Sequence, residues 1–355
     1  MDTAASDLAD RLVDSAVGFM DLLGVAIGDR LGFYRALAAS PGLTSAELAR
    51  HTRTHERYVR EWAEHQAVTG LLTATEGATP KERRYRPAAG VAEVLTDADS
   101  LVYLAPLARQ LAAAAVMLPA VADAYVSGGG VPWASYGRDM RESEGDLNRP
   151  AFLQLLADDW LAALPDVQRR LAQGNARVAD VGCGAGWSSI AIARSYPCEV
   201  DAFEVDHESV VLARGHVSDA GMESRVSVWE KDIGEVVVTT PYALVTAFEC
   251  LHDMPHPVAA LRAMRRLAAP DGTVLIADMK VADRFGAPGD DVERMMYGFS
   301  ILICLPDSMS AEDSAATGTV MRESTLRAYA EEAGFAVVDV LDVEHDMWRF
   351  YRLMS

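Results

Sequence analysis

A glycine-rich loop from Asp180 to Gly186, with the sequence DVGCGAG, follows a buried apolar run and precedes a helical pattern. Glycines at a strand-to-helix turn let the backbone bend tightly and approach a ligand without side-chain obstruction. A dinucleotide fingerprint would place its third glycine one position later, where Trp187 stands. Asp180 would also repel a pyrophosphate, whereas it can accept hydrogen bonds from the ammonium group of an amino-acid ligand. The loop therefore predicts a ligand other than a dinucleotide.

Two acidic residues follow at the ends of the next strand-like runs. Glu204 ends the second apolar run of this half of the chain, and Asp232 with Ile233 follows the third. A carboxylate at a strand end can accept both hydroxyls of a ribose, and a second one can accept an adenine amino group. Taken singly, each acid would be a solvated strand end. Together with the glycine loop they predict a nucleoside-bearing ligand along one edge of a sheet.

A histidine and an aspartate follow the fourth and fifth runs. His252 and Asp278 are therefore expected at the same carboxyl edge. Because an imidazole titrates near neutral pH, His252 oriented by Asp278 can act as a general base. The alternative is a histidine that packs in the core and moves no proton. We interpret the neighbouring Asp253 as a local helix cap.

The elements that must position these residues alternate along the second half of the chain. Apolar strand-like runs alternate with helical ones, as a parallel sheet buried on both faces requires. Two final runs, Phe335 to Val340 and Trp348 to Leu353, follow a helix that ends at Gly334, and the last is expected to pair antiparallel. The pattern predicts an α/β, Rossmann-like domain with a mostly parallel seven-stranded sheet, whose first five runs are Val178 to Val181, Val200 to Phe203, Val226 to Trp229, Ala243 to Phe248 and Thr273 to Ala277.

The first half of the chain is mainly helical. Thr44 and Glu47 have capping-box spacing, which marks a helix start. The stretch from Gly18 to about Thr96 has the outline of a helix-turn-helix followed by a polar wing, and an Ala/Leu-rich helical connector follows it. We therefore predict a winged-helix-like dimerisation domain over residues 1–95, a helical connector or lid over 96–173, and the Rossmann-like domain over 174–355.

Composition limits the partners. The 355 residues carry 32 Lys plus Arg and 52 Asp plus Glu, a net charge of −20, which opposes binding to nucleic acid or to an anionic membrane. Residues 1–86 hold 11 basic and 12 acidic residues, so the winged helix, at −1, lacks the basic surplus of a DNA reader. The acidic N-terminus, and a longest apolar run (Leu111 to Ala122) that is too short for a membrane span, predict a cytoplasmic protein. Four cysteines without CxxC spacing predict neither disulfides nor a metal site.

The glycine loop, Glu204 and Asp232 together resemble the class I S-adenosylmethionine-dependent methyltransferases. The resemblance implies S-adenosylmethionine as methyl donor and S-adenosylhomocysteine as product, with no metal. It assigns Asp180 and the loop glycines to the methionine end, Glu204 to the ribose, and Asp232 with Ile233 to the adenine. The implied cofactor-binding set is Asp180, Gly182, Cys183, Gly184, Gly186, Glu204, Val205, Asp232, Ile233 and Phe248.

The winged helix, the connector and the segment from Phe248 to Asp253 (FECLHD) are similar to the winged-helix O-methyltransferases of plants and actinobacteria. This resemblance covers nearly the whole chain and implies a homodimer and a small-molecule acceptor. It also implies that His252 is the base and that an acidic residue after the next strand orients it. The plant enzymes carry glutamate at that position, and this chain carries the shorter Asp278.

Four residues are candidates for contact with the acceptor. Trp133 and Tyr136 follow a triple glycine and can form an aromatic wall, while Met295 and Met296 lie after the fifth run and suit an apolar ligand. The aromatic pair can equally be core, and the methionine pair can equally be dimer core. The predicted function is methyl transfer to an aromatic or secondary-metabolite acceptor, with oxygen, nitrogen and carbon all open as the accepting atom. The alternative is a ligand-sensing winged-helix transcription regulator.

Overall fold

The computed structural model describes residues 3–237 and 240–355. The chain divides into two compact units, Met1–Ala112 and Ala113–Ser355. Each unit encloses hydrophobic side chains of its own, so each is described separately.

The first unit is a winged helix preceded by a long helix. Helices α3 (Ser45–Thr52) and α4 (Glu56–Val68) form the helix-turn-helix, and β2 and β3 form the wing. The three strands pair antiparallel in the order β1-β3-β2. The remaining elements are α1 (Thr3–Arg30), α2 (Phe33–Ala39), β1 (Leu43–Thr44), β2 (Leu72–Thr75), η1 (Pro80–Glu82), β3 (Arg84–Pro87), α5 (Val91–Thr96) and the start of α6 (Ala105–Val116).

Trp62 of α4 is a central residue in the core of this unit. Its ring lies 4.7 Å from the ring of Phe33 and 5.2 Å from that of Tyr34, and its Nε1 donates a hydrogen bond of 2.9 Å to the carbonyl of Gly24. A Cβ on Gly28 would lie 2.5 Å from the Trp62 ring, so α1 packs against this ring only because it carries glycine there. The winged helix is thus built around one aromatic cluster.

The predicted capping box at the start of α3 is confirmed. Thr44 Oγ1 accepts a hydrogen bond from Glu47 N (3.2 Å), and Glu47 Oε2 accepts one from Thr44 N (2.8 Å). Two amide groups that would otherwise lack partners at the helix start are therefore satisfied.

The second unit is built on a seven-stranded sheet in the order β6-β5-β4-β7-β8-β10-β9, as the apolar runs predicted. β10 pairs antiparallel with both β8 and β9, and the other pairs are parallel. The chain reverses its direction of strand addition between β4 and β7, and open α/β sheets bind ligands beyond the carboxyl ends of strands at such a point. The strands are β4 (Arg177–Val181), β5 (Glu199–Glu204), β6 (Val226–Glu230), β7 (Tyr242–Phe248), β8 (Ala268–Met279), β9 (Val337–Val340) and β10 (Trp348–Met354).

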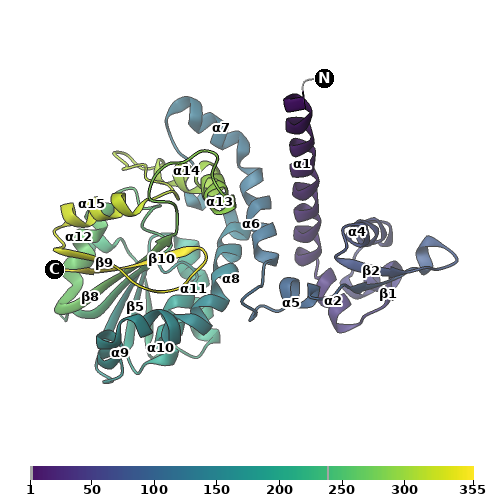
Figure 1. The fold of residues 1–355 in the computed structure, drawn as a ribbon. Coiled ribbons are helices and arrows are strands. Elements are labelled where there is room, and N and C mark those ends of the chain that lie inside the picture. The colour runs from purple at the N-terminus through teal and green to yellow at the C-terminus, as the bar shows by residue number, and fades with distance from the viewer. Residues whose placement is uncertain (1–2, 238–239) are drawn as a thin grey trace. The chain divides into compact units, whose positions relative to one another are not determined.

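Helices cover both faces of this sheet (Figure 1). One face packs against α8, α10 and α11, with Trp160 and Phe152 in its core, and the other packs against α12 and α15, with Leu261 and Leu326 in its core. The helix at the end of the chain stops at Gly334 (φ 92°), as predicted. The helices are α8 (Gly137–Leu155), α9 (Pro165–Leu171), α10 (Trp187–Ser195), α11 (His207–Asp219), α12 (Pro257–Leu267) and α15 (Glu323–Ala333), with short turns η3 (Leu156–Trp160), η4 (Leu161–Ala163) and η5 (Ile233–Glu235).

A smaller apolar cluster joins elements that precede β4 to elements that lie between β8 and β9. Tyr136, Met140, Ile303 and Cys304 are buried together in it. The elements are α7 (Leu118–Ser127), η2 (Trp133–Tyr136), α13 (Asp291–Phe299), η6 (Ser300–Cys304) and α14 (Leu305–Ser308). The turn η6 is π-helical, a conformation that is rare and frequently found at functional sites.

Among the described residues, no single helix is both long and apolar enough to cross a membrane. The consecutive helices α6 and α7 are long and apolar enough only when taken together, and the chain bends by 53° between them.

Candidate functional site

The glycine loop joins β4 to α10 at the carboxyl edge of the sheet. Gly182, Gly184 and Gly186 have φ values of 65°, 50° and 80°, the left-handed region that glycine tolerates best. A Cβ on Gly182 would lie 2.8 Å from the sulfur of Cys250, whereas a Cβ on Gly184 would meet no atom within 4 Å. The loop is therefore tightly packed at its start and open at its centre, where a ligand can approach the backbone.

Asp180 lies at the end of β4, only 1% exposed. Its Oδ2 accepts hydrogen bonds of 2.6 Å from the hydroxyls of both Ser188 and Ser189, and its Oδ1 accepts one of 2.8 Å from Thr246. Burial raises the pKa of this carboxyl, although the three hydroxyls act to lower it. The sequence placed Asp180 against a ligand ammonium group; in the structure its hydrogen bonds go to the first turn of α10 and to β7.

Glu204 ends β5 and turns back toward the loop. Its Oε2 accepts from Gly184 N (3.0 Å), and its Oε1 accepts from Val205 N (2.8 Å) and Asp206 N (3.0 Å). Burial raises the pKa of Glu204, and the three amide hydrogen bonds only partly offset it. The side chain of Val205 is 67% exposed. The predicted Glu204 is thus brought directly against the predicted loop.

Asp232 and Ile233 follow β6, the neighbour of β5. Asp232 is exposed and its Oδ1 accepts from Gly234 N (2.6 Å), while Ile233 is buried. The backbone N–H of Lys231 donates to Glu204 O (2.8 Å), which ties this segment to the end of β5. The loop, Glu204 and Asp232 therefore follow one another along the edge in the strand order β4, β5, β6.

Two members of the predicted cofactor set lie in the hydrophobic core. Phe248 is 6% exposed, with its ring 5.5 Å from that of Phe152 and 6.3 Å from that of Trp160. Cys183 belongs to the same buried cluster. In this structure their side chains pack beneath the edge rather than along it.

His252 and Asp278 meet as the sequence predicted. His252 Nδ1 lies 2.7 Å from Asp278 Oδ1, and Asp278 also accepts from the amides of Met279 (2.8 Å) and His252 (3.3 Å). The shorter aspartate therefore reaches the ring directly. Both side chains are buried, at 2% and 1% exposure.

Asp253 faces the other nitrogen of the same ring. Its Oδ1 lies 3.2 Å from His252 Nε2, so the side chain does not act as the local helix cap that we inferred from the sequence. Burial by itself lowers the pKa of His252. The negative charges of Asp253 and Asp278, together with the hydrogen bonds of the ring to Asp278 and Cys304, outweigh burial and raise this pKa well above its usual value. The ring is held between two carboxylates.

Sequence reasoning missed a second set of polar residues at this edge. Glu249, which follows β7, has a left-handed φ of 55°, and its Oε2 accepts a hydrogen bond of 2.6 Å from Asn148 of α8. Arg141, also on α8, binds Asp206 through both carboxylate oxygens, at 2.6 and 3.0 Å. These pairs join residues 101 and 65 positions apart, so no local sequence signal could have found them.

The four candidate acceptor contacts differ in environment. Tyr136 is 5% exposed and its hydroxyl donates to Leu302 O (2.7 Å), while Trp133 is partly exposed and its backbone N–H donates to Asp307 Oδ1 (2.6 Å). Met296 is 1% exposed in the sheet core, and Met295 is 38% exposed. Tyr136 of η2 and Cys304 of η6 belong to the same apolar cluster. Because Cys304 also interacts with His252, η2 lies on the side of η6 that faces this histidine.

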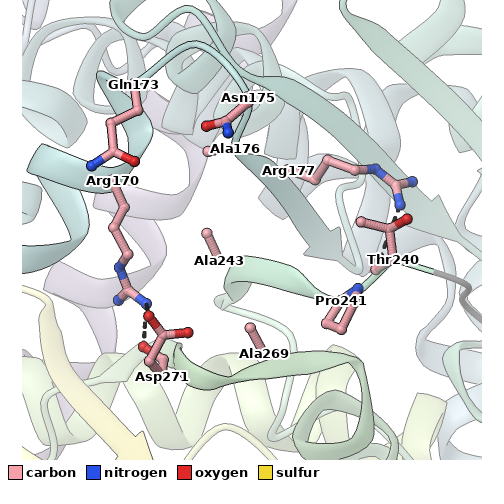
Figure 2. Close-up of a pocket in the computed structure, with 10 residues that line it drawn as sticks. All are labelled: Arg170, Gln173, Asn175, Ala176, Arg177, Thr240, Pro241, Ala243, Ala269 and Asp271. Carbon is pink, nitrogen blue, oxygen red and sulfur yellow. Dashed lines mark hydrogen bonds and ion pairs between the residues drawn. The ribbon is translucent and has the colours of Figure 1, made fainter.

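A hollow of about 180 Å³ lies at the opposite edge of the sheet (Figure 2). Arg177, at the start of β4, donates to the carbonyl of Thr240 (3.0 Å), and Arg170 pairs with Asp271 (3.5 Å). The hollow is therefore at the amino ends of the strands, away from the glycine loop and His252. Its arginines are already paired, and we assign it no part in the site.

Two protein families match the chain. A family described as a methyltransferase domain matches residues 151–340, and a family described as an Rv2258c-like winged HTH domain matches residues 19–96. The ubiquinone biosynthesis O-methyltransferase of Xylella fastidiosa is 24% identical over 188 residues, covering 52% of this chain and 70% of that protein. Its counterpart in Xanthomonas campestris is 33% identical over 115 residues, covering 32% of this chain and 47% of that protein.

Solved structures resemble the chain over nearly its full length. The mitomycin 7-O-methyltransferase MmcR has a TM-score of 0.70 at 19% identity, covering 99% of both chains. PigF with S-adenosylhomocysteine (SAH) has a TM-score of 0.71 at 16% identity, covering 97% of this chain and 98% of PigF. Human N-acetylserotonin methyltransferase in complex with S-adenosylmethionine has a TM-score of 0.66 at 20% identity, covering 98% of this chain and 97% of the human chain. These likenesses support the fold, and none supports a transcription regulator.

The packing of the loop makes a prediction that needs no ligand. Gly182→Ala should lower the free energy of unfolding by more than Gly184→Ala, because both add a side chain at positive φ but only the first collides with Cys250. Left-handed backbone costs about 1–3 kcal/mol for a non-glycine residue, so Gly184→Ala reports that cost alone. Urea denaturation measures both changes.

A second substitution isolates the collision. In the double variant Gly182→Ala/Cys250→Ala the loss should shrink toward that of Gly184→Ala, since the sulfur at 2.8 Å is gone and only the Cβ of residue 250, at 3.0 Å, remains close. Equal losses for Gly182→Ala and Gly184→Ala, with no coupling to Cys250, would show that the close contact does not exist.

Proposed function

We propose, since the chain belongs to the methyltransferase-domain family, that it transfers the methyl group of S-adenosylmethionine to a small-molecule acceptor. The observation that carries this proposal is the order of the glycine loop, Glu204 and Asp232 along neighbouring strand ends. The open space at Gly184 fits a ligand that approaches the backbone closely. NAD should not bind, because the glycine spacing lacks a pyrophosphate fingerprint. Calorimetry with S-adenosylmethionine and with NAD tests this, and NAD binding alone would overturn it.

Different residues of the chain bind different parts of the cofactor. The amides and open centre of the loop receive the methionine end, Glu204 accepts from the ribose hydroxyls, and Asp232 with Ile233 holds the adenine. Bound there, S-adenosylmethionine supplies an electrophilic methyl group on a sulfonium sulfur. Asp180 acts through the loop, because its oxygens hold α10 and β7.

His252 is proposed as the base for the acceptor. The names of the relatives support a hydroxyl as the accepting group, whose oxygen forms the new bond to the methyl carbon while the carbon–sulfur bond breaks. The hydroxyl proton goes to His252 Nε2, since Nδ1 is held by Asp278. Because Nε2 faces Asp253, the acceptor must take the place of that carboxylate. Trp133, partly exposed on η2, is the aromatic residue we propose beside the acceptor.

Glu204→Ala should weaken S-adenosylhomocysteine binding by about 1–3 kcal/mol, the range for ribose hydroxyls left without partners. Because burial raises the pKa of Glu204, affinity should fall with decreasing pH while the pH is still above the usual glutamate range, as the carboxylate gains a proton and loses its accepting capacity. Calorimetry across pH measures both effects, and the alanine variant should lack this acid limb.

Glu230→Ala is the matched control for that experiment. Glu230 pairs in register with Glu204 on the adjacent strand, but it is exposed and bound to His207. Affinity and its pH profile should remain as in the wild type. If Glu204→Ala also leaves both unchanged, the ribose assignment is wrong.

His252→Ala should lower the turnover number by about 10²- to 10⁴-fold, the usual contribution of a general base, while leaving cofactor affinity nearly unchanged. Asp278→Asn should cost less, because it misorients the ring without removing it. His256→Ala, an exposed histidine of the same segment, is the control and should retain activity. Release of S-adenosylhomocysteine across a panel of hydroxylated aromatic acceptors provides the assay. Near-wild-type turnover in His252→Ala would identify the residue as packing.

We also propose a homodimer in which α1 packs against a second copy of the chain. Residues 3–20 of this helix are exposed throughout, including the large apolar side chains of Leu8, Leu12 and Phe19, which are 44–61% exposed and spaced along one side. An apolar surface of this kind on a helix that packs on its own unit only near its end requires a partner.

Light scattering at micromolar concentration should therefore give twice the monomer mass, and Leu12→Glu/Phe19→Glu should give a monomer because charges cannot be buried unpaired. Val68→Glu is the control, since Val68 is 88% exposed on another helix, and it should remain a dimer. A monomeric wild-type protein would refute the proposal.

A further inference from the structure

The ring of His252 presents one nitrogen to a group of electron-pair donors. Asp278 accepts three hydrogen bonds, one of them from His252 Nδ1, so in the neutral ring Nδ1 carries the proton and Nε2 carries the lone pair. Asp253 Oδ1 lies 3.2 Å from Nε2, is enclosed, and makes no hydrogen bond of normal geometry with any described residue. In the neutral ring these two atoms are both acceptors, so a cation, either a proton or a metal ion, is needed between them.

Cys304 completes this group from a separate segment of the chain. One nitrogen of His252, one carboxylate oxygen of Asp253 and the sulfur of Cys304 all lie within 4.8 Å of one another. The thiol is 9% exposed, and it sits at the last residue of the π-helical turn η6. Three possible ligand atoms, brought together from two segments about fifty residues apart, converge on one point.

We propose that His252 Nε2, Asp253 and Cys304 bind a divalent cation of the Zn²⁺ class. Imidazole nitrogen, carboxylate oxygen and thiolate sulfur are the ligands that Zn²⁺ takes in proteins, and three protein ligands leave a fourth position for water. Magnesium and calcium prefer oxygen ligands, so the sulfur and nitrogen select against them. On binding, the thiol of Cys304 loses its proton to solvent and the thiolate forms the metal bond.

The surroundings of the cluster are those of a metal site. A ligating histidine almost always donates its other ring N–H to a carboxylate, and Asp278 accepts that hydrogen bond at 2.7 Å. Asp278 is itself fixed by the amide of Met279, so it holds the tautomer and the orientation of the ring.

The consequence for activity rests on the proposed function. A metal ion on Nε2 occupies the lone pair that would receive the proton of the acceptor, so it should inhibit methyl transfer reversibly. The cation site is thus a regulatory one, and removal of the metal by a chelator should restore activity.

Metal binding is tested on the full-length protein without a histidine tag, after treatment with a chelator. Calorimetry should show that Zn²⁺ saturates at one equivalent, and Co²⁺ should give a visible sulfur-to-cobalt charge-transfer band. Cys304→Ser should abolish that band and weaken Zn²⁺ binding at least about tenfold, and Asp253→Asn should weaken it as well. Asp278→Asn should weaken it by about 10–100-fold, the usual effect of losing such a partner.

Cys198→Ser is the matched control, since Cys198 is also buried but lies immediately before β5, at the opposite edge of the sheet. It should bind both metals as the wild type does. Zn²⁺ should raise the melting temperature of wild type and Cys198→Ser but not of Cys304→Ser, which also reports whether each variant is folded.

The outcomes separate this proposal from the proposed function. No Zn²⁺ binding, or equal binding by wild type and Cys304→Ser, would overturn the metal site and leave a proton as the cation on Nε2. A Zn²⁺ site with the cobalt signature but with undiminished methyl transfer would uphold the metal site and overturn His252 as the base.

Discussion

The carboxylate of Asp180 is the contact on which the rest of the edge depends. It joins the end of β4 to the first turn of α10 through Ser188 and Ser189, and to β7 through Thr246. A buried carboxylate is tolerated only when its oxygens are hydrogen-bonded, and here all three donors are hydroxyls of the same unit. The glycine loop between these elements is therefore held in one conformation. Through Gly184 N, which donates to Glu204, the loop in turn supports the end of β5, so one buried carboxylate helps to hold both the loop and Glu204.

The second constraint is the position of His252 between two carboxylates. Asp278 fixes the tautomer, and Asp253 faces the nitrogen left free to react. As we propose it, the same arrangement holds either a proton or a metal ion, because each is a positive charge placed between acceptor atoms. Either cation at Nε2 occupies the lone pair that a base needs, so His252 can act as the base only when Nε2 is free of both. Under these proposals, protons and metal ions compete for the lone pair of His252 Nε2.

Helix α8 covers this edge and is held there by polar contacts rather than by apolar packing alone. Arg141 binds Asp206 beyond β5, and Asn148 binds Glu249 beyond β7. These two pairs straddle the glycine loop in the strand order. Glu249 keeps an unfavourable left-handed backbone, and such strain is retained where surrounding contacts enforce it. Polar pairs thus hold α8 at the carboxyl edge of the sheet, and a hydrophobic pattern in the sequence cannot reveal them.

The sequence by itself determined the α/β class, the seven strands, the winged helix and the order of the loop, Glu204 and Asp232, because these follow from local periodicity and from strand ends that must meet at one edge. It also predicted that His252 and Asp278 would meet, since their strands are neighbours. Only the tertiary structure decided that Asp180 is hydrogen-bonded within the protein, that Phe248 packs in the core and that Asp253 faces His252. It alone joined Cys304 to His252 and Asn148 to Glu249. Contacts between segments fifty to a hundred residues apart depend on how the helices pack onto the sheet, and the pattern along the chain does not encode that packing.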